Sequence, residues 1–140
     1  MQVGLVPADL ERSLVFYREV IGLPYRGALR VAAGRTLHQF DADALGGPTG
    51  GTGATLKLVE LGPGDGVPAG RTGPTESFTG AVGIGWITLD VEDLDPIVVR
   101  ASDAGAVWQL PVTQFRPGLR VAIVEDPDGN AVELVERHDA

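Results

Sequence analysis

The chain repeats one pattern in its two halves, and this repeat constrains the fold more than any other feature. Residues 3–22 read VGLVPADLERSLVFYREVIG, and residues 87–105 read ITLDVEDLDPIVVRASDAG. Each segment has a β-prone run, an Asp-Leu pair, a helix-periodic stretch and a glycine. The two halves also end alike, with TLKLVE at 55–60 and AVELVE at 131–136. Such repetition predicts one supersecondary unit that buries its core against a copy of itself.

Turn and cap residues divide the chain into two modules of the same plan. Asp9 is a good N-cap for a first helix, and Gly22 is placed to end it. We expect a first βαβββ module at 1–61, a Gly/Pro-rich linker at 62–80 and a second βαβββ module at 81–140, packed as one compact domain. The other expected elements are strands at 25–33, 35–41, 55–61, 83–91, 106–114, 118–125 and 131–136, and a second helix at 94–104.

Composition excludes several classes of function. The 19 acidic and 11 basic residues give a net charge of −8, which argues against nucleic acid and against an anionic membrane surface. No run of residues is apolar enough to span a membrane, and a β-type pattern starts at Gln2 where a signal peptide would stand. We therefore expect a cytoplasmic protein. The absence of cysteine excludes disulfides, thiolate metal sites and a cysteine nucleophile.

Three stretches carry a resemblance to a known family. They are V-x-L-x-x-x-DLERSLVFYREVIGLPY at the start, DVEDL in the second module and EDPDGNAVELVE near the end. The chain resembles the vicinal oxygen chelate superfamily, which includes glyoxalase I, methylmalonyl-CoA epimerase, extradiol dioxygenases, and the fosfomycin and bleomycin resistance proteins. The resemblance implies an α+β fold in which two tandem βαβββ modules form a curled mixed sheet. Helices would cover the convex face, and a ligand or metal would occupy the concave cup.

Alternation along the expected strands assigns side chains to the two faces of the sheet. Val3, Leu5, Leu56, Leu58, Ile87, Leu89, Val91, Val132 and Leu134 should face the helices. Gln2, Gly4, Lys57, Trp86, Thr88 and Glu133 should then face the cup. In RTLHQFD, Leu37 is the expected core residue, which would turn His38 and Phe40 toward the cup.

The resemblance also implies where a metal would bind. Metal-dependent relatives place ligands on the first and last strands of each module, which here are Gln2, Lys57, Trp86 and Glu133. Trp86 is no ligand and Lys57 is itself a cation, so we expect no metal and no other cofactor. Lys57 could instead pair with Glu133 in the place of the metal, or its amine could extend to solvent. If a metal does bind, Gln2, His38 and Glu133 are the remaining ligand set.

The aromatic residues and the histidines each have a structural and a functional interpretation. Trp86 is a wall for a planar or apolar ligand or a filler of the cup. Trp108 contacts the ligand or packs the modules together. His38 is a general acid or base, or a hydrogen-bonded structural residue. His138 is a solvated tail residue.

Two hypotheses for the function follow, both with a small organic molecule as partner. In the first, Glu133, His38 or Lys57 transfers a proton in a metal-independent lyase, isomerase or cyclase, and Gln2, Thr88, Phe40, Trp86 and Trp108 line the site. In the second, the protein binds and sequesters a drug without catalysis, and its acidic balance suits a neutral or cationic compound. A metal-dependent glyoxalase-like enzyme with a degenerate ligand set is a third alternative. Exposed sheet edges also predict a homodimer.

Overall fold

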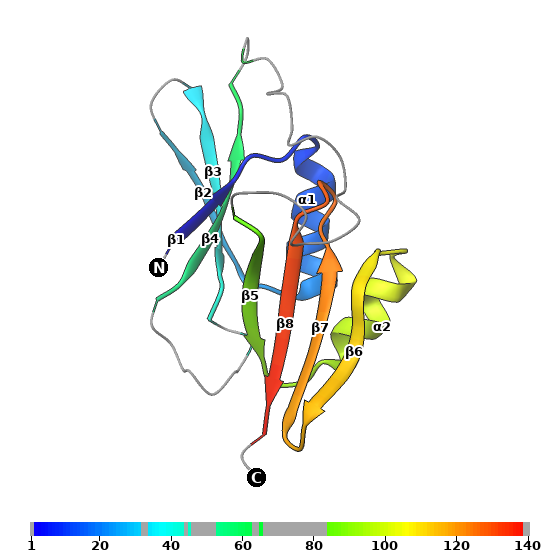
Figure 1. The fold of residues 1–140 in the computed structure, drawn as a ribbon. Coiled ribbons are helices and arrows are strands. Elements are labelled where there is room, and N and C mark those ends of the chain that lie inside the picture. The colour runs from blue at the N-terminus through cyan, green and yellow to red at the C-terminus, as the bar shows by residue number, and fades with distance from the viewer. Residues whose placement is uncertain are drawn as a thin grey trace.

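The computed structural model describes residues 2–31, 34–43, 45, 53–62, 65 and 84–138. The first module contains β1 (Gln2–Leu5), α1 (Leu10–Val15), η1 (Phe16–Ile21), β2 (Tyr25–Arg30), β3 (Thr36–Asp41) and β4 (Thr55–Glu60). The second contains β5 (Trp86–Val91), α2 (Asp95–Asp103), β6 (Trp108–Arg116), β7 (Leu119–Glu125) and β8 (Ala131–Arg137). The predicted βαβββ repeat and the α+β fold are therefore confirmed (Figure 1).

The two sheets have the same topology. The strand order is β1-β4-β3-β2 in the first and β5-β8-β7-β6 in the second. In each sheet the first and last strands of the module pair in parallel, and the other neighbours pair antiparallel. Lys57 lies opposite Gly4, and Glu133 lies opposite Thr88. The sequence repeat is thus a structural repeat, in which Lys57 and Glu133 hold equivalent places.

The first helix begins and ends where its sequence predicts. The Asp9 carboxylate accepts a hydrogen bond of 3.1 Å from the backbone N–H of Arg12, as an N-cap does. Gly22 ends the helix at φ 91°, a left-handed conformation that glycine adopts without strain. The second half, η1, is a π-helix rather than the regular α-helix that the spacing predicted. Both Phe16 and Tyr17 are buried there, with their rings edge to face at 5.0 Å between centroids.

One hydrophobic core joins the two modules on the helix side of both sheets. The residues predicted to face the helices do so: Val3, Leu5 and Ile87 pack against the core, and Leu56, Leu58, Leu89, Val91, Val132 and Leu134 are buried in it. The helices connect the modules, because the Arg100 side chain of α2 donates to the backbone carbonyls of Val20 and Ile21 in η1. Both helices lie on one side of the second sheet, which leaves its other face for the cup (Figure 1).

One predicted segment cannot be compared with the structure in full. The linker at 62–80 lies outside the described residues apart from positions 62 and 65, so the module boundaries stay a prediction. Within the described residues, no helix is long and apolar enough to cross a membrane.

Candidate functional site

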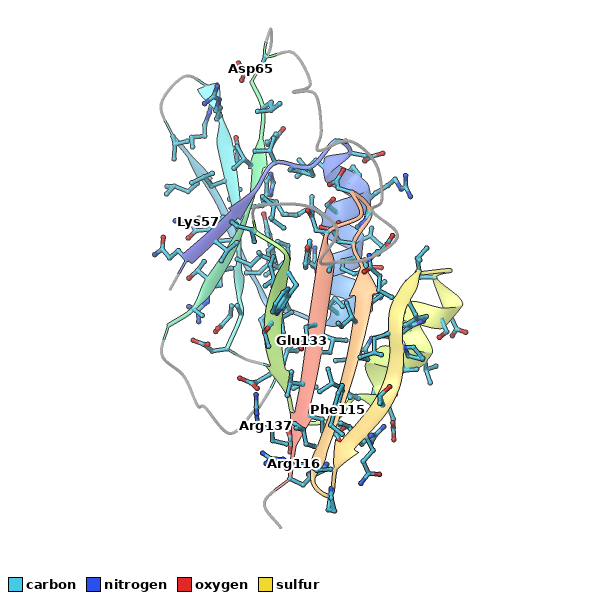
Figure 2. All side chains as sticks on the ribbon, in the orientation of Figure 1. Lys57, Asp65, Phe115, Arg116, Glu133 and Arg137 are labelled. Atoms are coloured by element: carbon cyan, nitrogen blue, oxygen red, sulfur yellow. The ribbon has the colours of Figure 1, made fainter. Side chains whose placement is uncertain are left out.

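The concave face carries the side chains that alternate with the core residues. In the second sheet, the side chains of Trp86, Thr88 and Glu133 are exposed or half-buried. They project from the face opposite to that of the buried Leu89 and Leu134. In the first sheet, Gln2 and Lys57 alternate in the same way with Val3 and the buried leucines of β4. The predicted facing of these polar residues is confirmed, and Figure 2 shows Lys57 on the first sheet and Glu133 on the second.

Glu133 is held in place by its neighbour on β5. The hydroxyl of Thr88 donates a hydrogen bond of 2.6 Å to Oε2 of Glu133. The two residues are directly opposite each other in the parallel pair β5–β8, so the contact follows from the strand register. Within the described residues, Oε1 of Glu133 accepts no hydrogen bond. One carboxylate oxygen is therefore fixed, and the other is left for a ligand.

Lys57 is also held within its own sheet. Its Nζ donates a hydrogen bond of 2.6 Å to Oε1 of Gln2 on β1. Among the ion pairs that join described residues, none links Lys57 to Glu133, so the first of the two alternatives for Lys57 is not found in this structure. The reason is proximity. Gln2 is the polar neighbour of Lys57 in the first sheet, and Thr88 is the polar neighbour of Glu133 in the second.

The four places at which metal-dependent relatives hold a metal do not form a ligand set here. The side chains at those places are the amide of Gln2, the ammonium of Lys57, the indole of Trp86 and the carboxylate of Glu133. The Gln2 carbonyl oxygen, the best neutral ligand among them, accepts a hydrogen bond from the Lys57 cation instead. No group of three or more His, Asp or Glu residues in the described part of the chain could hold a metal ion. The donor set therefore does not fit a divalent cation.

Trp86 stands at the seam between the modules. Trp86 is 46% exposed. Beside it, a cavity of ≈ 180 Å³ runs between β1 and β5. The cavity is lined mostly by apolar groups: Val3, Gly4, Leu5, Ile84, Gly85, Trp86, Ile87, Asn130 and Ala131. At Gly4, no described atom lies within 4 Å of the position that a Cβ would occupy, so the seam has open space there.

The predicted orientation of His38 and Phe40 is wrong. Phe40 is 0% exposed and packs in the core against Tyr17 and Tyr25. His38 is opposite Leu58 in the β3–β4 register, so it shares the helix side of the sheet, whereas Leu37 lies opposite Val59 and faces the cup. Leu37 and Phe40 are both apolar and project from opposite faces of β3, so only one of them can face the core. The larger side chain, the aromatic ring of Phe40, is the one that is buried.

His38 belongs instead to a hydrogen-bonded group on the helix side of the first sheet. Its Nδ1 is 2.9 Å from the hydroxyl oxygen of Tyr25, and its Nε2 is 2.9 Å from a carboxylate oxygen of Glu60. These contacts fit the structural interpretation of this histidine. They also separate His38 from Gln2 and Glu133, with which it was expected to share a metal.

Trp108 packs against the hydrophobic core, as its module-packing interpretation predicted. Opposite this core, the concave face has an apolar floor that the sequence did not reveal. Val121, Ile123 and Val135 are buried there, and the register places Ile123 directly opposite Glu133. Strand β7 is apolar at every position from Val121 to Val124, so alternation could not tell which of its residues face the cup.

A buried polar group that the sequence did not reveal lies at the turn between β7 and β8. The Tyr17 hydroxyl donates a hydrogen bond of 2.7 Å to Oδ2 of Asp126, whose side chain also accepts from the backbone N–H groups of Asp128 and Asn130. Burial, followed by the charge of Asp126, raises the pKa of Tyr17 well above its ordinary value. This contact ties the first-module helix to the second sheet and supports the fold beneath the cup.

The comparisons with known proteins agree with this architecture. The model of the glyoxalase/bleomycin resistance protein/dioxygenase superfamily matches residues 2–134. No curated protein matches the chain. Many solved structures share the fold.

Three of the similar structures come from bacteria. A glyoxalase family protein from Bacillus cereus is 21% identical with a TM-score of 0.74, and the match covers 99% of this chain and 93% of that one. A glyoxylase/bleomycin resistance protein/dioxygenase domain from Frankia sp. EAN1pec is 21% identical with a TM-score of 0.67, covering 98% and 95%. TnmS3, an antibiotic binding protein from Streptomyces sp. CB03234, is 22% identical with a TM-score of 0.63, covering 98% and 93%.

Proposed function

The chain belongs to the glyoxalase/bleomycin resistance protein/dioxygenase superfamily, and from this premise we propose that it binds a small organic molecule in the cup and transfers a proton there without a metal. Glu133 is the general base. The observation that carries the proposal is the Thr88–Glu133 hydrogen bond of 2.6 Å, which fixes a carboxylate on the concave face. A positioned carboxylate of this kind is what proton abstraction requires.

Lys57 supplies the complementary charge. When Glu133 takes a proton from a carbon next to a carbonyl, the electrons of the broken C–H bond move into an enolate, and negative charge develops on the carbonyl oxygen. An ammonium that faces the same bound ligand would stabilise that charge, and in this proposal Lys57 provides it. Gln2 holds the Lys57 amine through a hydrogen bond of 2.6 Å and so limits its motion. This role gives Lys57 the electrostatic part that a metal plays in other members of the family.

The same first step serves several reaction types. Return of the proton from Glu133 to the same carbon or to its neighbour gives an isomerase. Loss of a leaving group from the adjacent carbon gives a lyase, and attack of the enolate carbon on a second carbonyl of the substrate gives a cyclase. In each case Glu133 is the group that gains and then returns the proton.

A second candidate function is binding without catalysis. The half-exposed indole of Trp86 and the apolar seam cavity beside it favour this alternative, since both suit a planar ligand that does not react. TnmS3, which shares the fold, is described as an antibiotic binding protein. A sequestering role would use the same cup but would not need Glu133 as a base.

Deuterium exchange separates the two candidates. Aryl ketones such as propiophenone and benzoylpropionate are incubated with the protein in D2O, and NMR follows loss of the proton next to the carbonyl. We expect exchange above the buffer rate, and we expect Glu133→Gln to reduce this catalysed exchange by about 100-fold or more. Glu92→Gln, an exposed carboxylate beyond the end of β5, is the matched control. Binding of the ketones with exchange at the buffer rate would favour sequestration.

Two further expectations stay proposals. A homodimer would cover the outer strands β2 and β6, where Leu29 is 53% and Val112 is 37% exposed. Sedimentation at tens of micromolar protein tests it, and a monomer alone would contradict it. Location in the cytoplasm stays a prediction from the sequence.

A further inference from the structure

Two arginines lie in one row across the second sheet. Arg116 of β6 is opposite Leu119 of β7, and Leu119 is in turn opposite Arg137 of β8. The register shifts between Gln114 and Arg116, so the face of Arg116 is given by its own pairing with Leu119 and not by alternation along β6. Leu119 shares its parity with Ile123, the partner of Glu133, so this face is the concave one. Figure 2 shows Arg116 and Arg137 together at one end of the sheet, with Glu133 further along β8.

The backbone fixes the two arginines relative to each other. Arg116 and Leu119 flank the turn at Pro117-Gly118, where Gly118 has φ 78°. The carbonyl of Gly118 accepts a hydrogen bond of 2.8 Å from the N–H of His138, which directly follows Arg137. A Cβ on residue 118 would lie only 2.4 Å from the carbonyl oxygen of His138. Glycine is therefore required both for the turn and for its close approach to the end of β8.

The charges of the row are only partly balanced. Nε of Arg137 is 3.3 Å from Oδ1 of Asp90, which projects from the same face of β5. Arg116 forms no hydrogen bond or ion pair with any described residue, and its side chain is exposed. The row therefore has one uncompensated positive charge at the end of the cup, although the whole chain has a net charge of −8.

The surface between Glu133 and the arginines suits the body of a small molecule. Arg137 follows Glu133 by four residues on one strand, which is about 13 Å between Cα atoms. Val121 and Val135 lie between them and are almost fully buried, whereas Phe115, next to Arg116, is 62% exposed. A ligand that touches both ends would place an apolar segment over this part of the sheet.

We propose that this arginine row, Arg116 and Arg137, binds a carboxylate of the ligand, so that the protein acts on small organic acids with a carbonyl group. A guanidinium matches the planar carboxylate with two parallel hydrogen bonds, and Arg116 has its donors free for it. The acid group would then set the position of the carbonyl-adjacent carbon relative to Glu133. This inference rests on the proposed function, because it assumes that the ligand occupies the cup.

Isothermal titration with a matched pair of probes tests the row. Benzoylpropionate has an aryl ketone and a carboxylate, and its methyl ester has the same shape without the charge. We expect wild-type protein to prefer the acid, and Arg116→Gln to weaken binding of the acid about tenfold while changing binding of the ester by less than about twofold. Arg137→Gln should act in the same direction. Arg30→Gln, which removes an exposed arginine at the far end of β2, is the matched control and should change neither affinity.

The outcomes separate this inference from the proposed function. If acid and ester bind equally well, and Arg116→Gln alters neither, the row does not bind the carboxylate, whereas ligand binding in the cup stands. If Arg30→Gln weakens the acid as much as Arg116→Gln does, the effect is one of overall charge and the inference is overturned. If neither probe binds to the wild-type protein, the proposed function and the inference fail together.

Discussion

Lys57 and Glu133 occupy equivalent places in the two modules, opposite Gly4 and Thr88, and carry opposite charges on the faces of their sheets that point away from the core. The repeat thus places an acid and a base in structurally related positions. Each side chain is held by a polar neighbour in its own sheet, through hydrogen bonds of 2.6 Å to Gln2 and from Thr88. Because neither charge neutralises the other, both are available to a ligand.

The first prediction concerns Trp86. Trp86→Ala should weaken binding of aryl ketones, since the indole is the aromatic surface beside the seam cavity. Its side chain is 46% exposed, so the free energy of unfolding should fall by much less than the roughly 3–5 kcal/mol typical of a buried aromatic. Calorimetric titration and urea unfolding measure the two effects. A large loss of stability with unchanged affinity would make Trp86 a structural filler.

A substitution at Gly4 tests the seam from the other side. Gly4→Leu adds a side chain where no described atom lies within 4 Å, so it should fold normally and narrow the cavity between β1 and β5. We expect the free energy of unfolding to change by no more than about 1 kcal/mol and ketone affinity to decrease. Ala28→Leu, on the exposed outer strand β2, is the matched control. Unchanged affinity in Gly4→Leu would show that ligands do not reach the seam.

Tyr17 gives the protein a defined response to alkaline pH. Burial raises the pKa of Tyr17 well above 10.0, so the unfolded chain loses this proton at a lower pH than the folded protein does. The ionisation of Tyr17 should therefore add no pH dependence to the free energy of unfolding below pH 10.0, and above it the free energy of unfolding should fall as pH rises. In Tyr17→Phe this part of the alkaline loss should disappear.

At neutral pH, Tyr17→Phe removes one hydrogen bond from buried Asp126 and should cost about 1–2 kcal/mol. Tyr25→Phe serves as the control, because it removes the other tyrosine of the chain. Urea unfolding at neutral and alkaline pH provides the comparison. An alkaline loss that is the same in Tyr17→Phe and in the wild-type protein would refute the assignment.

A buried carboxylate on the helix side predicts a larger effect. Glu136 is 1% exposed, and its Oε1 is 3.2 Å from Nη1 of Arg120. Arg120→Met would leave this carboxylate with the Leu94 N–H and the His138 ring as its partners. The free energy of unfolding should still fall by about 3 kcal/mol, and the double variant with Glu136→Gln should recover part of the loss. Arg30→Met is the control for an exposed arginine. A loss below about 1 kcal/mol would mean that water reaches Glu136 in the variant.

How much of the side-chain arrangement can be predicted from the sequence depends on how clearly apolar and polar residues alternate along each strand. Ile87, Leu89 and Val91 alternate with polar residues or with Trp86, and their facing was predicted correctly. In TLHQFD, Leu37 and Phe40 are apolar at opposite parity, and only the packed structure decides between them. The sequence gives the direction of a side chain in a regular strand, but not which of two apolar residues fills the core better.

The charged groups show a different limit. The sequence placed Lys57 and Glu133 on the concave face, but the partner of each depends on lateral strand register, which brings Gln2 and Thr88 closer. The row of Arg116 and Arg137 depends on the register across the turn at Pro117-Gly118. The net charge of −8, from which we expected a neutral or cationic ligand, is a sum over the whole chain. It therefore does not show where two arginines lie close together.

Mapping the bound probe by methyl NMR tests the central claim most directly. Ile and Val methyl groups mark both faces of the second sheet: Ile123 and Val135 lie on the concave face, and Ile97 and Val132 lie on the helix side. Benzoylpropionate is titrated into the labelled protein, and the shift of each methyl signal is recorded. The account predicts that the largest shifts occur at Ile123 and Val135 and are reduced in Glu133→Gln or Arg116→Gln. Shifts centred on Ile97 and Val132, with Ile123 and Val135 unchanged, would contradict it.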